Sequence, residues 1–251
     1  MSIGISYRSR FQRREDATQY DVDVYRNGTV HDLLWQTECP ILERVVTRLR
    51  DRLGHLDYLD FACGTGRILS HLEPLVDKAT GLDVSQAMLE RAAKKVDQAQ
   101  LICGDISQSD ELLDRKYDLI TAFRFLTNAE PELRRTVLER LVSKLKGPDS
   151  LLLVNIHANP LSYKAAMVPY HWVRSFLQTS PWQNNLSRAQ TVAELKQAGL
   201  QVQSVIGMGF VSGKLVPFAK FDSLVKLERG LAGMPGLQRF GVNQLFVCRR
   251  T

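Results

Sequence analysis

The segment from residue 58 to residue 67 reads YLDFACGTGR, an apolar run followed by a glycine-rich turn. Directly after it, apolar residues recur at helical spacing between Ile68 and Val76. This order predicts a strand that ends in a tight loop and continues into a helix. Gly64 and Gly66 let the main chain pass close to a ligand, and the N–H groups at a helix start favour its polar and anionic parts.

Acidic residues follow the next two predicted strands. Asp83 ends an apolar segment about twenty residues after the glycine turn, which is the spacing of nucleotide-binding βαβ units. Asp105 follows a third apolar segment at residues 100–103. In such a unit, a carboxylate at the place of Asp83 accepts hydrogen bonds from two ribose hydroxyls. With Asp60 in the first strand, three successive strands carry an acid at their carboxyl ends and predict a nucleotide site.

These residues resemble the motifs of the class I S-adenosylmethionine-dependent methyltransferases. Their first motif, acid-x-Gly-x-Gly-x-Gly, matches residues 60–66, with Ala62 where glycine is commoner and the main chain therefore slightly stiffer. The resemblance covers residues 55–157. It implies that S-adenosyl-L-methionine is the cofactor and S-adenosyl-L-homocysteine the product, with Asp83 at the ribose and Asp105 on the adenine side. The cofactor contacts expected on this basis are Tyr20, Tyr25, Asp60, Ala62, Cys63, Gly64, Gly66, Asp83, Val84, Met88, Asp105, Ile106 and Phe123.

Strand and helix patterns alternate along the chain, which predicts an α/β fold with a doubly wound parallel sheet. The expected strands are at residues 58–62, 79–83, 100–103, 117–123, 150–156, 201–206 and 243–248. The resembled family implies a Rossmann-like, seven-stranded sheet whose last strand is antiparallel. A length of 251 residues suits one domain. We divide it into an N-terminal lid and helix region (1–53), a cofactor-binding core (54–158) and a substrate-side insertion with the C-terminal strands (159–251).

Aromatic residues gather on both sides of the predicted core. In the resembled family, N-terminal segments fold over the cofactor, so Tyr20 and Tyr25 are expected in a helical lid. The insertion after the fifth strand is rich in aromatic residues and would overhang the carboxyl edge of the sheet, where ligands bind in this architecture. The substrate contacts that we expect are Arg124, Phe125, Tyr163, Tyr170 and Trp172.

The residues after the fourth and fifth strands bear on the methyl acceptor, on a possible metal ion and on the catalytic base. Members of the class that methylate nucleobase amino groups or glutamine carry Asn/Asp-Pro-Pro-aromatic after strand four, where this chain reads AFRFLTN (residues 122–128). The sequence therefore argues against those acceptors and against nucleic acid. Arg124, Asn128, Asn155 and His157 form a poor shell for Mg²⁺, so no metal is expected. An imidazole titrates near neutrality, so His157 is a candidate base, with His171 as a second candidate. The alternative for His157 is that it only packs or forms a hydrogen bond in the turn.

We therefore predict methyl transfer to a small molecule, by in-line displacement onto oxygen, with a small amine as the alternative acceptor. The net charge of +6 keeps an RNA or protein methyltransferase open, and a non-catalytic cofactor-binding partner subunit is a further alternative. An NAD-dependent oxidoreductase would need G-x-G-x-x-G/A, but Leu69 occupies the third small-residue position. The four cysteines lack metal or redox spacing, and we find no apolar leader and no run long enough to span a membrane. We expect a cytoplasmic protein, and no pattern bears on its oligomeric state.

Overall fold

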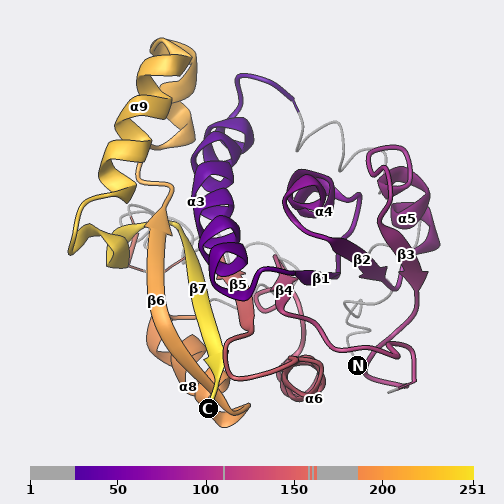
Figure 1. Ribbon diagram of the computed structural model, residues 1–251. Coiled ribbons are helices and arrows are strands. Elements are labelled where there is room, and N and C mark those ends of the chain that lie inside the picture. Colours follow the sequence, from indigo (N-terminus) through magenta and orange to yellow (C-terminus); the bar gives the residue numbers. More distant parts are fainter. Residues whose placement is uncertain (1–25, 110, 158, 160, 163–185) are drawn as a thin grey trace, which may run out of the picture.

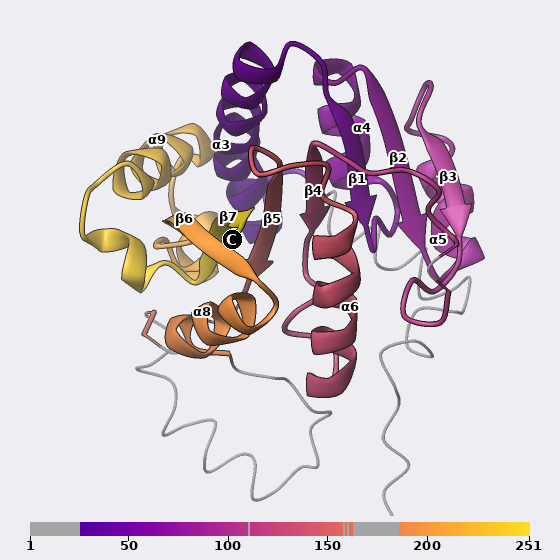
Figure 2. The same ribbon diagram turned by 60° about the horizontal axis from the view of Figure 1, so that its bottom comes forward.

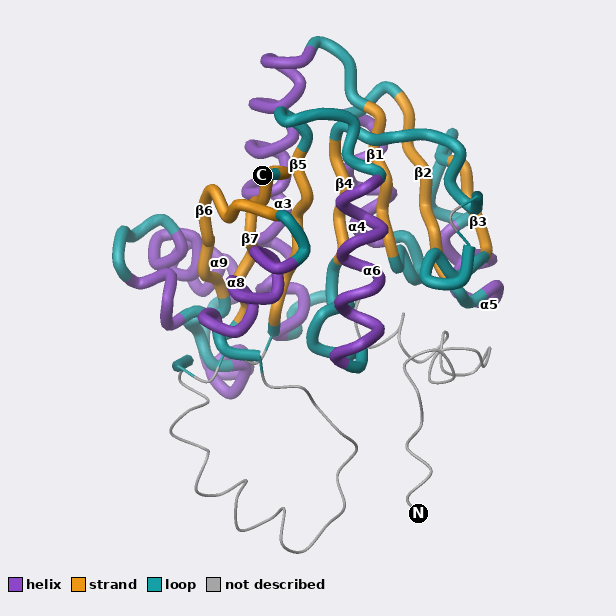
Figure 3. Tube along the Cα trace, turned by 90° about the horizontal axis from the view of Figure 1, so that it is seen from below, coloured by secondary structure: helices purple, strands orange, loops and turns teal. Residues whose placement is uncertain are grey.

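The computed structural model describes residues 26–109, 111–157, 159, 161–162 and 186–251. Within these residues, seven strands form one sheet in the order β3-β2-β1-β4-β5-β7-β6 (Figure 3). The five strands from β3 to β5 are parallel, and β7 runs antiparallel to both of its neighbours. The strands are β1 (Asp57–Phe61), β2 (Lys78–Asp83), β3 (Gln100–Cys103), β4 (Leu119–Ala122), β5 (Leu151–Ile156), β6 (Leu200–Met208) and β7 (Asn243–Arg250).

Helices cover both faces of this sheet (Figures 1 and 2). They are α3 (Val30–Leu53), α4 (Arg67–Leu72), α5 (Gln86–Ala92), α6 (Pro131–Ser143), α8 (Arg188–Gln197) and α9 (Phe221–Ala232), with short 3-10 turns at Glu73–Leu75, Gly213–Phe218 and Leu237–Phe240. None of the described helices combines the length and the apolar character that crossing a bilayer requires.

Alternate residues of the central strands build two separate cores. In β5, Leu151 and Leu153 pack in the cluster that contains apolar residues of α3 and α4, whereas Leu152 and Val154 pack in the cluster with residues of α6 and α8. This follows from the two-residue period of a strand, and it explains why β5 is apolar at nearly every position.

The predicted architecture is confirmed: the sheet is Rossmann-like, has seven strands and ends in an antiparallel one. One strand is shorter than predicted, because β4 covers Leu119–Ala122 rather than residues 117–123. Tyr117 instead forms an isolated bridge with Leu145, after α6, and Phe123 has left the ladder to line a cavity. The N-terminal lid and most of the aromatic insertion lie outside the described residues.

Helix α3 contains a proline, and its neighbour α9 compensates for it. Thr29 caps the helix start, with its hydroxyl oxygen accepting the N–H of Asp32. Pro40 has no N–H, so the carbonyl of Gln36 lacks its usual donor one turn later. The guanidinium of Arg229 in α9 donates to that carbonyl from Nε at 3.1 Å and from Nη2 at 2.7 Å. The two helices, which lie side by side in Figure 1, are therefore joined at the broken turn.

A buried ion pair fixes the loop that follows β4. Arg134 of α6 is only 4% exposed and forms a two-pronged pair with Glu194 of α8, at 2.9 and 2.8 Å. Its Nη1 also donates to the carbonyls of Leu126 and Ala129. The Arg134 guanidinium therefore pairs with Glu194 and also holds the main chain of the loop after β4 by hydrogen bonds.

Candidate active site at the carboxyl edge of the sheet

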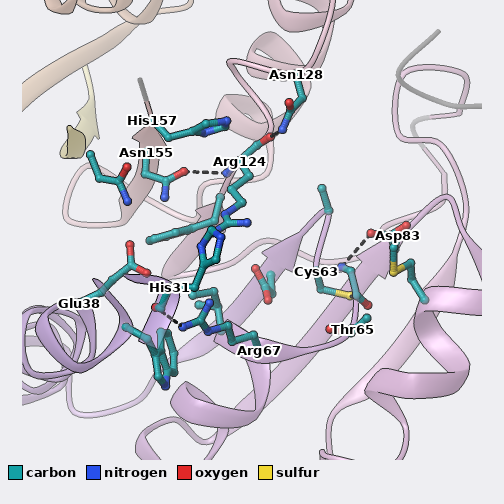
Figure 4. Close-up of a pocket in the computed structure, with 18 of the residues that line it drawn as sticks. His31, Glu38, Cys63, Thr65, Arg67, Asp83, Arg124, Asn128, Asn155 and His157 are labelled. Atoms are coloured by element: carbon teal, nitrogen blue, oxygen red, sulfur yellow. Dashed lines mark hydrogen bonds between the residues drawn. The ribbon is translucent and has the colours of Figure 1, made fainter. Parts of the chain in front are cut away.

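A cavity of about 330 Å³ opens beyond the carboxyl ends of β1, β2, β4 and β5. It lies where the strand order reverses, with β2 and β3 on one side of β1 and β4 and β5 on the other. In open α/β sheets this switch point is the place where ligands bind. Figure 4 shows residues from α3, from the glycine-rich loop and from the ends of β4 and β5 converging on it.

The loop after β1 has an unusual backbone. Ala62, Gly64 and Gly66 all have positive φ, of 54°, 55° and 78°. A Cβ added at Gly66 would lie 2.9 Å from the Cβ of Ala92 and 3.0 Å from its Cα, so α5 packs directly on the loop there. A Cβ at Gly64 would meet no atom within 4 Å. Gly66 is therefore required by packing, whereas Gly64 serves a sharp turn with open space beside it.

Asp83 holds this loop from the end of β2. Its Oδ2 accepts the N–H of Gly64 at 2.8 Å, and its Oδ1 accepts the N–H of Ser85 at 2.9 Å. Burial raises the pKa of this carboxyl, and the main-chain donors of Ser85, Gly64 and Val84 counteract part of that effect. A carboxylate accepts about four hydrogen bonds. These main-chain donors therefore leave unused acceptor capacity on Asp83, which lines the cavity.

Asp60 is a second buried acid at the cavity. Its Oδ1 accepts the hydroxyl of Thr121 at 2.6 Å, and that hydroxyl also pairs with the Tyr58 OH at 2.7 Å. Its Oδ2 is buried and has no hydrogen-bond partner within the described ranges. Burial raises the pKa of Asp60 to about 7, and the nearby Asp83 adds to the rise. The site therefore offers a carboxyl oxygen to a ligand that brings a donor or a positive charge.

The cavity is also lined by residues of α3, by the ends of β4 and β5, and by the first residues of α4 and β7. They are His31, Leu34, Trp35, Glu38, Arg67, Phe123, Arg124, Asn128, Asn155, His157 and Asn243. The guanidinium of Arg67 stacks 4.3 Å above the Trp35 ring and donates to the carbonyl of His31, which ties α4 to α3. Asn155 accepts the N–H of Arg124 at 2.6 Å, and Arg124 has a positive φ of 55°. The side chain of Asn155 in β5 thus helps to fix the main-chain conformation directly after β4.

Most of the described site residues predicted from sequence come together at this cavity. They are Asp60, Ala62, Cys63, Gly64, Asp83, Val84, Met88, Phe123, Arg124 and His157. The His157 ring contacts the Thr127 hydroxyl, with Nδ1 at 2.8 Å. Among the described residues that line the cavity or contact the site, we find no group of three or more His, Cys, Asp or Glu side chains that could hold a metal ion.

Other predicted residues lie elsewhere. Ile106 and Phe125 are each 1% exposed and belong to the core, where the Phe125 ring packs edge-on against Phe61 at 5.0 Å. Asp105 accepts the N–H and the hydroxyl of Ser107 and does not line the cavity. The predicted contacts that lie outside the described residues are Tyr20, Tyr25, Tyr163, Tyr170, His171 and Trp172.

Sequence reasoning missed His31 and Glu38, because α3 precedes every recognisable motif. A signal was present in the helical pattern. Leu34, Glu38, Ile41 and Val45 follow one another at spacings of four, three and four, so Glu38 falls on the same helix face as the three apolar residues. An acid inside an apolar stripe indicates either a buried partner or a site.

The sheet order and the strand-end cavity define a class I S-adenosylmethionine-dependent methyltransferase fold. Residues 59–147 match the family model of the methyltransferase domain.

Two curated relatives share parts of the sequence. A malonyl-[acyl-carrier protein] O-methyltransferase of Priestia megaterium is 37% identical over 101 residues, which cover 38% of this chain and 34% of that protein. A dTDP-4-amino-2,3,4,6-tetradeoxy-D-glucose N,N-dimethyltransferase of Saccharopolyspora spinosa is 35% identical over 92 residues, which cover 36% of this chain and 35% of that protein. The chain therefore matches about a third of the length of each relative.

A solved structure agrees over nearly the whole chain. The magnesium protoporphyrin IX methyltransferase of Synechocystis PCC 6803, crystallised with bound S-adenosylhomocysteine, superposes with a TM-score of 0.65. The alignment covers 98% of this chain and 100% of that one at 16% identity. At this identity the likeness establishes a shared fold.

Proposed function

We propose that this protein transfers a methyl group from S-adenosylmethionine to an oxygen atom of a small molecule. The observation that carries the proposal is the position of Asp83, which holds the glycine-rich loop through Gly64 and keeps acceptor positions for a ribose at the edge of the cavity. Gly64 and Cys63 offer main chain to the cofactor, Met88 and Val84 offer apolar contact, and Asp60 offers a carboxyl oxygen. When bound, the cofactor supplies a methyl group already activated on a sulfonium sulfur.

The protein's own part in such a reaction is to bind the cofactor and the acceptor and to orient them toward each other. Holding two reactants in line contributes roughly 7 kcal/mol or more in favourable cases. We place the acceptor in the part of the cavity that is lined by polar side chains of α3 and of the ends of β4 and β5, and we call it the acceptor part. We propose that Arg124, which lines the cavity, contacts a carboxylate on the acceptor. No serine or cysteine nucleophile is required, and burial raises the pKa of the Cys63 thiol far above neutrality.

Two observations support oxygen as the methyl acceptor. The chain lacks the Asn/Asp-Pro-Pro-aromatic motif after β4, which argues against the nitrogen of nucleobase amino groups and of glutamine, and the Priestia megaterium relative is named as an O-methyltransferase. The Saccharopolyspora spinosa relative is named for dimethylation of nitrogen on an amino sugar, so a small amine is the second candidate.

Calorimetric titration tests the cofactor. We expect the protein to bind S-adenosylmethionine and S-adenosylhomocysteine and to give no binding heat with NAD⁺. Retention of NAD⁺ without either adenosyl compound would overturn the proposal.

A panel of acceptors then tests the reaction through release of S-adenosylhomocysteine. Matched pairs that differ only in a hydroxyl or an amino group separate the two candidates: hydroxy acids against amino acids, and phenols against anilines. We expect turnover with hydroxyl members; turnover confined to the amino members would establish the second candidate instead.

A further inference from the structure

Glu38 is an acid in the acceptor part of the cavity. It lies on α3, and in Figure 4 its carboxyl points from that helix toward the side where Asn155 and Arg124 lie. Its Oε1 is buried and has no hydrogen-bond partner in the part of the chain that the structure describes. A buried acceptor without a donor costs free energy, and native structures keep few of them without a reason.

The surroundings of Glu38 are charged as well as polar. Burial raises the pKa of Glu38, whereas the guanidinium groups of Arg67 and Arg124 and the amide of Asn155 lower it. These groups come from three elements: α4, the loop after β4 and β5 itself. His31 and His157 line the same cavity, and the Cys39 thiol, whose pKa is raised to about 12, adjoins Glu38 in α3. The net pKa shift is upward, so burial, which favours the neutral acid, outweighs the two cations, which favour the carboxylate.

His157 is less well placed to serve the acceptor. Both ring nitrogens lie within hydrogen-bond distance of the Thr127 hydroxyl, at 2.8 and 3.2 Å, so the ring is turned to a partner within the protein. The Oε1 of Glu38, by contrast, has no such contact with a described residue. Of these two groups, the carboxyl has an acceptor position available for a ligand.

We propose that Glu38 binds the nucleophilic group of the methyl acceptor, a hydroxyl or an amine, and faces it toward the reacting end of the cofactor. The inference rests on the proposed function. As the acceptor atom forms its bond to the methyl carbon, its proton passes to the Glu38 carboxylate, and the electron pair of the broken carbon–sulfur bond stays on sulfur. The acceptor must therefore carry a hydrogen on the atom that is methylated.

Sinefungin tests this placement without any acceptor, because it carries an amine in place of the methylated sulfonium. An ammonium at that position reports a carboxylate that faces the methyl group. Calorimetry at pH 8 should show the wild-type protein binding sinefungin about tenfold or more tightly than S-adenosylhomocysteine, as expected for a charge-assisted contact. Glu38→Gln should remove this preference and change affinity for S-adenosylhomocysteine by less than about twofold. Glu43→Gln is the matched control on the same helix, since Glu43 is 49% exposed, pairs with His71 and does not line the cavity.

The pH dependence gives a second readout. The added amine, like a lysine, stays protonated well above the pH range in which a carboxyl ionises, so the preference for sinefungin should rise with pH as Glu38 ionises and stay flat in Glu38→Gln. A preference that Glu38→Gln leaves unchanged would overturn the assignment of Glu38. Failure of the wild-type protein to bind either compound would instead overturn the proposed function. A folded Glu38→Gln protein that binds S-adenosylhomocysteine normally and loses only the sinefungin preference supports both.

Discussion

The Oδ2 of Asp83 accepts the backbone N–H of Gly64 at 2.8 Å, so the acid that ends β2 also fixes the loop that follows β1. Gly64 has a positive φ, which glycine adopts readily, and the hydrogen bond from its N–H helps to hold the turn in place. A residue that resembles a ribose-binding acid in sequence therefore has a structural role before any ligand arrives.

We expect Asp83→Asn to weaken binding of S-adenosylhomocysteine about tenfold or more, since hydrogen bonds to a charged group contribute about 1.5–3 kcal/mol. The amide still offers one oxygen to Gly64 or to Ser85, so the free energy of unfolding should fall by only about 1–2 kcal/mol. Calorimetry and urea unfolding measure the two effects. Asp114→Asn, at a side chain that is 87% exposed, should change neither quantity. Unchanged affinity in Asp83→Asn would remove this residue from the cofactor site.

Two glycines of the same loop should respond differently to alanine. Gly66→Ala combines a positive φ with a clash against Ala92, so we expect the free energy of unfolding to fall by about 2–4 kcal/mol. Gly64→Ala pays the cost of φ alone, about 1–2 kcal/mol, because no atom lies near its added Cβ. Urea unfolding compares them, with Gly147→Ala as the control in open space at ordinary φ. Equal losses at both loop positions would show that α5 yields to the added methyl group.

The sequence predicted which residues meet around the glycine-rich loop, because these residues are close together along the chain. Asp60, Gly64 and Gly66 belong to one turn, and Asp83 ends the next strand, so a local pattern carries their arrangement. The antiparallel last strand came from family resemblance, and residues 243–248 alone would not have set its direction.

The acceptor part could not be predicted in the same way. Glu38 comes near Arg124 and Asn155 only after α3 packs on the sheet, because both residues lie more than eighty positions after it in the sequence. Phe125 shows the opposite error. Its place after β4 predicted a substrate contact, but the chain turns at Arg124, where φ is positive, and the ring packs against Phe61. A backbone reversal at a residue other than glycine leaves no signal in composition.

Asp60 should make stability depend on pH in an unusual direction. Its ordinary pKa is 3.8, and burial raises it to about 7 in the folded protein. Between these values the folded protein holds more protons than the unfolded chain, so the contribution of Asp60 to stability falls as pH rises from about 4 to about 7. Asp60→Asn cannot ionise and should escape this loss. Relative to wild type, its free energy of unfolding should improve between pH 4.5 and pH 8 by up to about 4 kcal/mol.

Urea unfolding at those two pH values measures the change, and Asp114→Asn again provides the exposed control. An offset between Asp60→Asn and wild type that is the same at both pH values would show that Asp60 keeps its ordinary pKa in the folded protein.

The contact between Arg229 and Gln36 gives a prediction that a double-mutant cycle can isolate. Arg229→Ala removes both donors from the Gln36 carbonyl that Pro40 leaves without a helical partner, and should lower the free energy of unfolding by about 0.5–1.5 kcal/mol. In a Pro40→Ala background, the N–H of the new alanine supplies the missing donor, so Arg229→Ala should cost much less. Unfolding of the four proteins in urea gives the coupling energy. Arg44→Ala, at an exposed arginine on the same helix, should cost the same in both backgrounds. If Arg229→Ala also costs the same with and without the proline, Arg229 joins α9 to α3 through its packing and not through the carbonyl.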